Sequence, residues 1–89
     1  MRSECVHTQP VAFHRCNDGA HHLFNVQPDV PAHAALECAC LLLDAAEELA
    51  VQATSTGSEQ LGYACGYLIE MARAAMQACL ESDAGPKAL

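Results

Sequence analysis

Histidine and cysteine side chains gather in the first part of the chain, where they could hold a metal ion. Three pairs occur there: Cys5-x-His7, His14-x-Cys16 and His21-His22. Imidazole nitrogen and thiolate sulfur are ligands that Zn²⁺ prefers. Structural zinc sites usually combine a C-x₂-C pair with an H-x₃₋₅-H pair, and neither spacing occurs here. We therefore predict that these are ordinary polar residues of an N-terminal arm, with no metal and no cofactor.

One segment superficially resembles a catalytic motif, the nucleophile elbow: Gly62-Tyr63-Ala64-Cys65-Gly66. In the elbow the nucleophile takes the central position and follows a strand. Here Ala64 is central, and the segment belongs to a predicted helix. Because no complete catalytic motif is present, we expect the protein not to be an enzyme.

Length and composition limit the chain to one small domain. Among its 89 residues are 17 alanines, two Phe, two Tyr and no Trp, so large core-forming side chains are scarce. Four Lys and Arg against eleven Asp and Glu give a net charge of −7. Nucleic acids and anionic lipids are both bound mainly through basic side chains. We therefore expect no direct contact with nucleic acid and none with a membrane.

The six cysteines are expected to be free thiols. The first residues lack the apolar stretch of a secretory signal, and no stretch is long enough to cross a membrane, so we expect a soluble, cytoplasmic protein. In the cytoplasm thiols stay reduced, and a cysteine acts as a small buried apolar residue. In the predicted helical hairpin described below, Cys65 faces the region of Glu47 and Cys79 that of His33, too far from any other helix cysteine for a disulfide.

Residues 1–29 form an N-terminal arm without helical periodicity. Two short runs, residues 11–16 and 21–26, flank the turn signal Asn17-Asp18-Gly19. Such a pattern is typical of a short β-hairpin, although an extended arm is the alternative.

Residues 30–83 have the periodicity of two helices. Asp29 or Val30 is expected to cap the first helix, with Pro31 in its first turn. Thr56 and Glu59 have the spacing of a capping box for the second helix. Gly85-Pro86 is expected to stop that helix, and residues 84–89 form a C-terminal tail. Apolar positions recur every three or four residues in both helices: Ala35, Ala39, Leu42, Ala46, Leu49 and Ala53, then Leu61, Cys65, Leu68, Ala72, Ala75 and Cys79. The fold class is therefore mainly α, an antiparallel αα-hairpin.

The apolar surface of each helix is too wide for a single neighbour. It spans about 220° of the helix circumference, whereas one partner helix needs only a narrow stripe. The arm covers part of the remainder, and a second copy of the hairpin is expected to cover the rest. The sequence thus predicts a homodimeric four-helix bundle whose central layers contain Leu42, Leu49, Leu61 and Leu68.

Exposed aromatic residues are the candidates for binding a partner, because they offer large contact area at low entropic cost. Tyr63 lies on the acidic side of the second helix, with Tyr67 at the border of its apolar surface and Met71 one turn later. Phe13 and Phe24 on the arm form a second candidate patch. Packing at the edge of the core is the alternative for all of them.

Three segments together resemble a family of short pseudomonad proteins that is classed as a domain of unknown function. They are Phe13-His14-x-Cys16, Leu23-Phe24-x-Val26 and the helix containing Leu41-Leu42-Leu43-Asp44, and the similarity covers roughly residues 11–82. A quorum-sensing antiactivator is associated with that group. The resemblance implies a helical dimer that binds a LuxR-type, LasR-like receptor and prevents receptor dimerisation and DNA binding.

Two functional classes are open at this point. The first is a protein-binding module that sequesters a transcription factor, favoured by the resemblance and by an acidic surface that could meet a basic DNA-binding protein. The second is a structural, assembly or antitoxin-like dimer without a transcriptional target. The acidic composition fits both.

Overall fold

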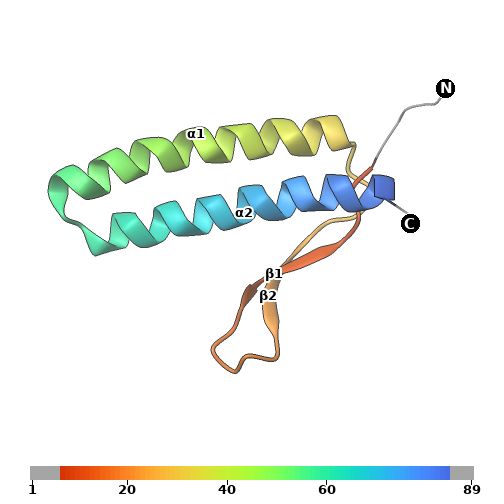
Figure 1. Ribbon diagram of the computed structural model, residues 1–89, viewed down its shortest axis with the longest axis horizontal. Helices are drawn as coiled ribbons and strands as arrows, with labels where there is room; N and C mark the ends of the chain where they lie inside the picture. The colour runs from red at the N-terminus through yellow and green to blue at the C-terminus, as the bar shows by residue number, and fades with distance from the viewer. Residues whose placement is uncertain (1–6, 85–89) are drawn as a thin grey trace.

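The computed structural model describes residues 7–84, and side chains up to residue 80. Strands β1 (Val11–Arg15) and β2 (His22–Val26) come first, followed by helices α1 (Ala32–Thr56) and α2 (Glu59–Ala84). Figure 1 shows the two helices lying side by side and the β-hairpin projecting from the α2 side. The predicted mainly helical class, helical hairpin and β-hairpin are confirmed.

The helices meet through the small residues that the periodicity indicated. Every predicted apolar position of the two stripes is buried or half-buried, and Ala39 and Ala72 are the most enclosed. The predicted register is correct to within one residue: the Cys65 thiol donates to the Ala46 carbonyl at 3.3 Å, and the Cys79 thiol to the Ala32 carbonyl at 3.7 Å. The dimer-core candidates Leu42, Leu49, Leu61 and Leu68 are half-buried.

The helix caps differ from the prediction. Helix α1 begins at Ala32, with Pro31 at the N-cap position rather than in the first turn and without a side-chain cap bond. It extends to Thr56 because Gly57, at φ 73°, adopts the left-handed conformation that ends a helix and donates to the Ala53 carbonyl at 2.8 Å. Ser58 then caps α2 by accepting the Leu61 N–H at 3.2 Å, so the predicted Thr56 capping box was wrong.

The two strands of the β-hairpin pair antiparallel, with an interruption at His14. Val11 lies opposite Val26 and Phe13 opposite Phe24. At the turn, Asp18 accepts hydrogen bonds from the His21 ring at 2.6 Å and from the backbone N–H groups of Ala20 and His21. These bonds, the His21 ring bond foremost, hold the pKa of Asp18 below its ordinary value. The Asn17-Asp18-Gly19 signal therefore identified the turn correctly.

The β-hairpin packs on a second buried face of α2. Val11 forms a small apolar cluster with Ala74 and Ala78, against which Phe13 and Val26 pack. Ala74 and Ala78 lie outside the predicted helix stripe, because the stripe describes only the contact with α1. Helix α2 consequently has two neighbours, α1 and the β-hairpin.

Thr8 connects the arm to the segment that leads into α1. Its side chain is 1 % exposed. The hydroxyl donates to the Gln27 carbonyl at 2.7 Å and accepts from the Val30 N–H at 3.0 Å. Its backbone N–H donates to the Val30 carbonyl, and its carbonyl accepts from the Asp29 N–H. The residue thus ties the segment before β1 to the segment that joins β2 to α1.

None of the five cysteines within the described residues forms a disulfide: Cys16, Cys38, Cys40, Cys65 and Cys79. The sixth, Cys5, lies outside the described residues. In residues 7–84, no helix has both the length and the hydropathy needed to cross a membrane.

Replacing Thr8 by Val should lower the free energy of unfolding by about 1–3 kcal/mol, because the Val30 N–H and Gln27 carbonyl lose their buried partner. Thr8→Ser keeps the hydroxyl and removes one methyl group, which costs about 1 kcal/mol. Urea titrations followed by circular dichroism measure both. A Thr8→Val variant no less stable than Thr8→Ser would show that the hydroxyl bonds are unimportant.

The thiols should react with a maleimide in the folded protein in an order set by exposure. Cys38 and Cys40 are exposed and should react first. Cys79 should react last, because burial raises its pKa and shields its sulfur. Mass spectrometry of digests taken at successive times gives the order, and all differences should vanish in denaturant.

Candidate protein-interaction surface

An exposed apolar groove lies where the β-hairpin meets α2. We call it the aromatic groove; its volume is about 320 Å³, and it is lined by His14, Leu23, Phe24, Tyr67 and Met71. Four of these five are large, exposed apolar or aromatic residues. The two candidate patches inferred from the sequence thus contribute to a single surface, with Phe24 from β2 and Tyr67 and Met71 from α2.

The remaining candidates lie at the border of this groove. Phe13 packs against the ring of Phe24, with ring centroids 5.6 Å apart, but it is half-buried and does not line the groove. Tyr63 is 57 % exposed, one turn before Tyr67, which is 53 % exposed. Since Tyr63 does not line the groove either, the two tyrosines differ in setting although they are equally accessible.

His14 joins the two halves of the aromatic groove. Its Nδ1 donates to Oε1 of Glu70 on α2 at 2.9 Å. Its ring meets Tyr67 edge-on at 5.4 Å between centroids and lies 5.7 Å from Phe24. His14 has φ 64°, a left-handed conformation that is uncommon for a residue with a side chain. This role of His14 was not predicted from the sequence, because neither its φ nor its partner on α2 follows from local pattern.

The side chains that line the aromatic groove suit recognition of an apolar surface. Within residues 7–84, no three His, Cys, Asp or Glu side chains come close enough to hold a metal ion together. The groove instead combines flat aromatic rings with the flexible Met71, side chains that are enriched at protein interfaces. A partner's apolar side chain inserted here would contact strand and helix together.

Comparison with known proteins places the chain in a family. The family model described as "Protein of unknown function (DUF3077)" matches residues 8–81. The chain belongs to the DUF3077 family. The match spans both strands, α1 and most of α2, and it confirms the predicted resemblance to a family of unknown function. No curated protein and no solved structure matches the chain.

Replacing Glu70 by Ala should loosen the β-hairpin from α2 in this DUF3077 protein, because His14 loses its partner. The pair is half-exposed, so the loss of global stability should stay below about 1 kcal/mol. The sensitive measurement is the nuclear Overhauser contact between the His14 and Tyr67 rings, which should weaken. Glu37→Ala is the control, since the Glu37–His33 pair is confined to the exposed surface of α1. Equal contacts in both variants would contradict a role for Glu70 in docking.

Proposed function

We propose that the protein is a non-enzymatic antiactivator of the QslA kind, which binds a LuxR-type, LasR-like transcription factor and blocks its dimerisation and DNA binding. The observation that carries the proposal is the aromatic groove. Leu23, Phe24 and Tyr67 expose large apolar area in one place, and such patches on small proteins mark interaction sites. The partner class comes from the resemblance of the arm and first helix to the antiactivator's family.

The negative charge of this chain supports a DNA-binding regulator as the partner. The same charge argues against a mechanism in which this chain competes with the regulator for DNA. The acidic residues Glu37, Asp44 and Glu48 are all exposed on α1. A DNA-binding protein is basic, so opposite charges would speed its encounter with this chain. A chain with a net charge of −7 cannot itself occupy the phosphate backbone. Inhibition therefore has to act by covering a surface that the receptor needs for its own pairing.

The active form is proposed to be a homodimer in which two helical hairpins form a four-helix bundle. Helix α1 has α2 as its only large neighbour among the described elements, and Leu36, Leu41, Leu43 and Val51 remain exposed on it. Covering such residues with a second copy would remove apolar surface from water. The location proposed for the dimer is the cytoplasm, where the receptor acts.

Tyr67→Ala should weaken receptor binding by about 2 kcal/mol or more, roughly thirtyfold, because it removes the exposed aromatic ring that α2 contributes to the aromatic groove. Tyr63→Ala is the matched control: it deletes an equally exposed tyrosine on the same helix and should cost less than threefold. Isothermal titration calorimetry with the receptor's ligand-binding domain measures both affinities. Circular dichroism checks that both variants keep their helix content. Equal losses for the two variants would rule out the groove as the binding surface.

The inhibition itself should be visible when the protein is titrated into a complex of the receptor with its promoter DNA. Fluorescence anisotropy of labelled DNA should report release, and sedimentation velocity should show the receptor dimer disappearing in parallel. Unchanged DNA binding at saturating protein would refute the antiactivator function. DNA release with an intact receptor dimer would refute the proposed mechanism.

A further inference from the structure

The aromatic groove brings three aromatic rings together at the contact between the β-hairpin and α2. The His14 ring lies 5.7 Å from the Phe24 ring and 5.4 Å from the Tyr67 ring, measured between centroids. Phe24 and Tyr67 are both more than half exposed, so a ligand can reach a ring on β2 and a ring on α2 at once. The faces of aromatic rings carry partial negative charge and attract cations. A groove with this lining can therefore hold an apolar group or a cation.

His14 adds a hydrogen-bond acceptor to the groove. Its Nδ1 carries a proton, because the ionised carboxylate of Glu70 can only accept. In the neutral imidazole the other ring nitrogen, Nε2, is then an acceptor, and it has no hydrogen bond within residues 7–84. A purely apolar side chain that covered His14 would take Nε2 away from water without replacing the lost bond, which is unfavourable. The occupant should therefore carry a hydrogen-bond donor.

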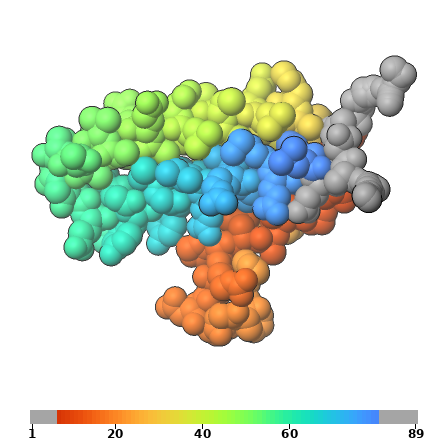
Figure 2. All heavy atoms as spheres, in the orientation of Figure 1, coloured from red at the N-terminus to blue at the C-terminus, as the bar shows by residue number. Residues whose placement is uncertain are grey.

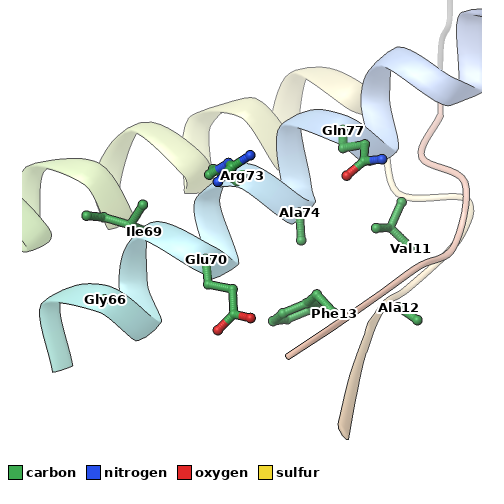
Figure 3. Close-up of a pocket in the computed structure, with 9 residues that line it drawn as sticks. All are labelled: Val11, Ala12, Phe13, Gly66, Ile69, Glu70, Arg73, Ala74 and Gln77. Carbon is green, nitrogen blue, oxygen red and sulfur yellow. The ribbon is translucent and has the colours of Figure 1, made fainter. Parts of the chain in front are cut away.

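The charges around the groove favour a donor that is also a cation. Oε1 of Glu70 accepts from His14, whereas Oε2 has no hydrogen bond within the described part of the chain, and the side chain is half-exposed. Neither arginine in that part lines the aromatic groove: Arg15 donates to the Gly19 carbonyl at 2.7 Å, and Arg73 lines a separate groove next to β1 (Figure 3). The whole chain carries a net charge of −7. A positive group from a partner would thus meet opposite charge both locally and overall.

An arginine side chain matches each of these features. Its planar guanidinium is always charged, stacks on aromatic rings, and donates hydrogen bonds without accepting any. Its methylene groups can pack on Leu23 and Met71, the aliphatic part of the lining. Lysine matches less well, because its ammonium group is compact and strongly hydrated. Tryptophan can donate one hydrogen bond but brings no charge to Glu70.

We propose that the aromatic groove binds an arginine side chain of the partner protein. The guanidinium lies against the rings of Phe24 and Tyr67. One of its N–H groups donates to Nε2 of His14, and its charge is balanced by Glu70. His14 is then the residue that makes the groove selective for a donor. The inference rests on the proposed function only in taking the receptor as the source of this arginine.

The direct test titrates the full chain with blocked amino acids at constant ionic strength. The probes are N-acetyl-arginine methylamide, the citrulline analogue, which has the same length and a planar but neutral end group, and the apolar norleucine analogue. Side-chain NMR signals of His14, Phe24 and Tyr67 report binding. We expect the arginine probe to bind saturably and at least about fivefold more tightly than either analogue. The arginine probe should also shift the nitrogen signal of His14 Nε2. Norleucine or citrulline binding as tightly as arginine would overturn the proposal.

Two conservative variants test the contacts within the groove. Tyr67→Leu keeps an apolar side chain and removes the ring, and Glu70→Gln removes the charge but keeps an oxygen that can accept from His14. Each should weaken binding of the arginine probe about threefold or more. Glu48→Gln is the matched control, since it removes one negative charge from the exposed surface of α1, and it should change the affinity less than about twofold. Equal losses for Glu48→Gln and Glu70→Gln would mean that only the total charge attracts arginine, which would overturn the site.

The same variants in the receptor titration separate this inference from the proposed function. If the receptor inserts an arginine, Tyr67→Leu should lose about as much receptor affinity as Tyr67→Ala, and Glu70→Gln should lose affinity too. Receptor binding that tolerates Tyr67→Leu but not Tyr67→Ala would show that an apolar side chain fills the groove; the arginine inference then fails and the antiactivator function stands. Selective binding of the arginine probe without any receptor binding would support the arginine site and refute the proposed partner.

Discussion

The use of alanine as the main core residue is the constraint on which the rest of this structure depends. Helices α1 and α2 are in contact through residues such as Ala39, Ala46 and Ala72, and the largest side chain that is almost fully enclosed is Thr8. Small side chains let the helices approach closely but bury little apolar area per contact. Several leucines and three of the four aromatic rings therefore remain exposed, whereas Leu42, Leu49, Leu61 and Leu68 are half-buried. Large apolar side chains such as Leu23, Phe24 and Tyr67 are exposed as a result. Figure 2 shows the β-hairpin projecting from the body that the two helices form.

Polar contacts hold the β-hairpin in place beside its small apolar cluster. Thr8 fixes the base of the β-hairpin, and the His14–Glu70 pair fixes its middle to α2. Holding His14 at φ 64° costs about 1–2 kcal/mol for a residue with a side chain. The hydrogen bond to Glu70 and the edge-on contact with Tyr67 offset that cost. The strained residue is thus kept in place by the groups that form the aromatic groove.

The sequence predicted the features that depend on local residue patterns, namely the two helices and their register. The spacing of apolar residues located both helices, and the position of the turn placed Cys65 beside Ala46 to within one residue. The sequence could not predict contacts that depend on where the β-hairpin docks: the burial of Ala74 and Ala78, and the pairing of His14 with Glu70. It also placed the cap of α2 at Thr56 rather than Ser58, because the capping-box spacing does not reveal that Thr56 is still the last residue of α1, which Gly57 ends.

The left-handed backbone at His14 explains how one short strand can serve two surfaces. In a regular strand Phe13 and His14 would point to opposite faces, and only one of them could reach α2. Here Phe13 packs on the cluster around Ala74, while His14 contacts Tyr67 and Glu70 of the same helix. Phe13 consequently lines a second groove together with Ile69 and Glu70 of α2 (Figure 3), whereas His14 lines the aromatic groove. A chain too small for two separate sites can in this way present two different surfaces from adjacent residues.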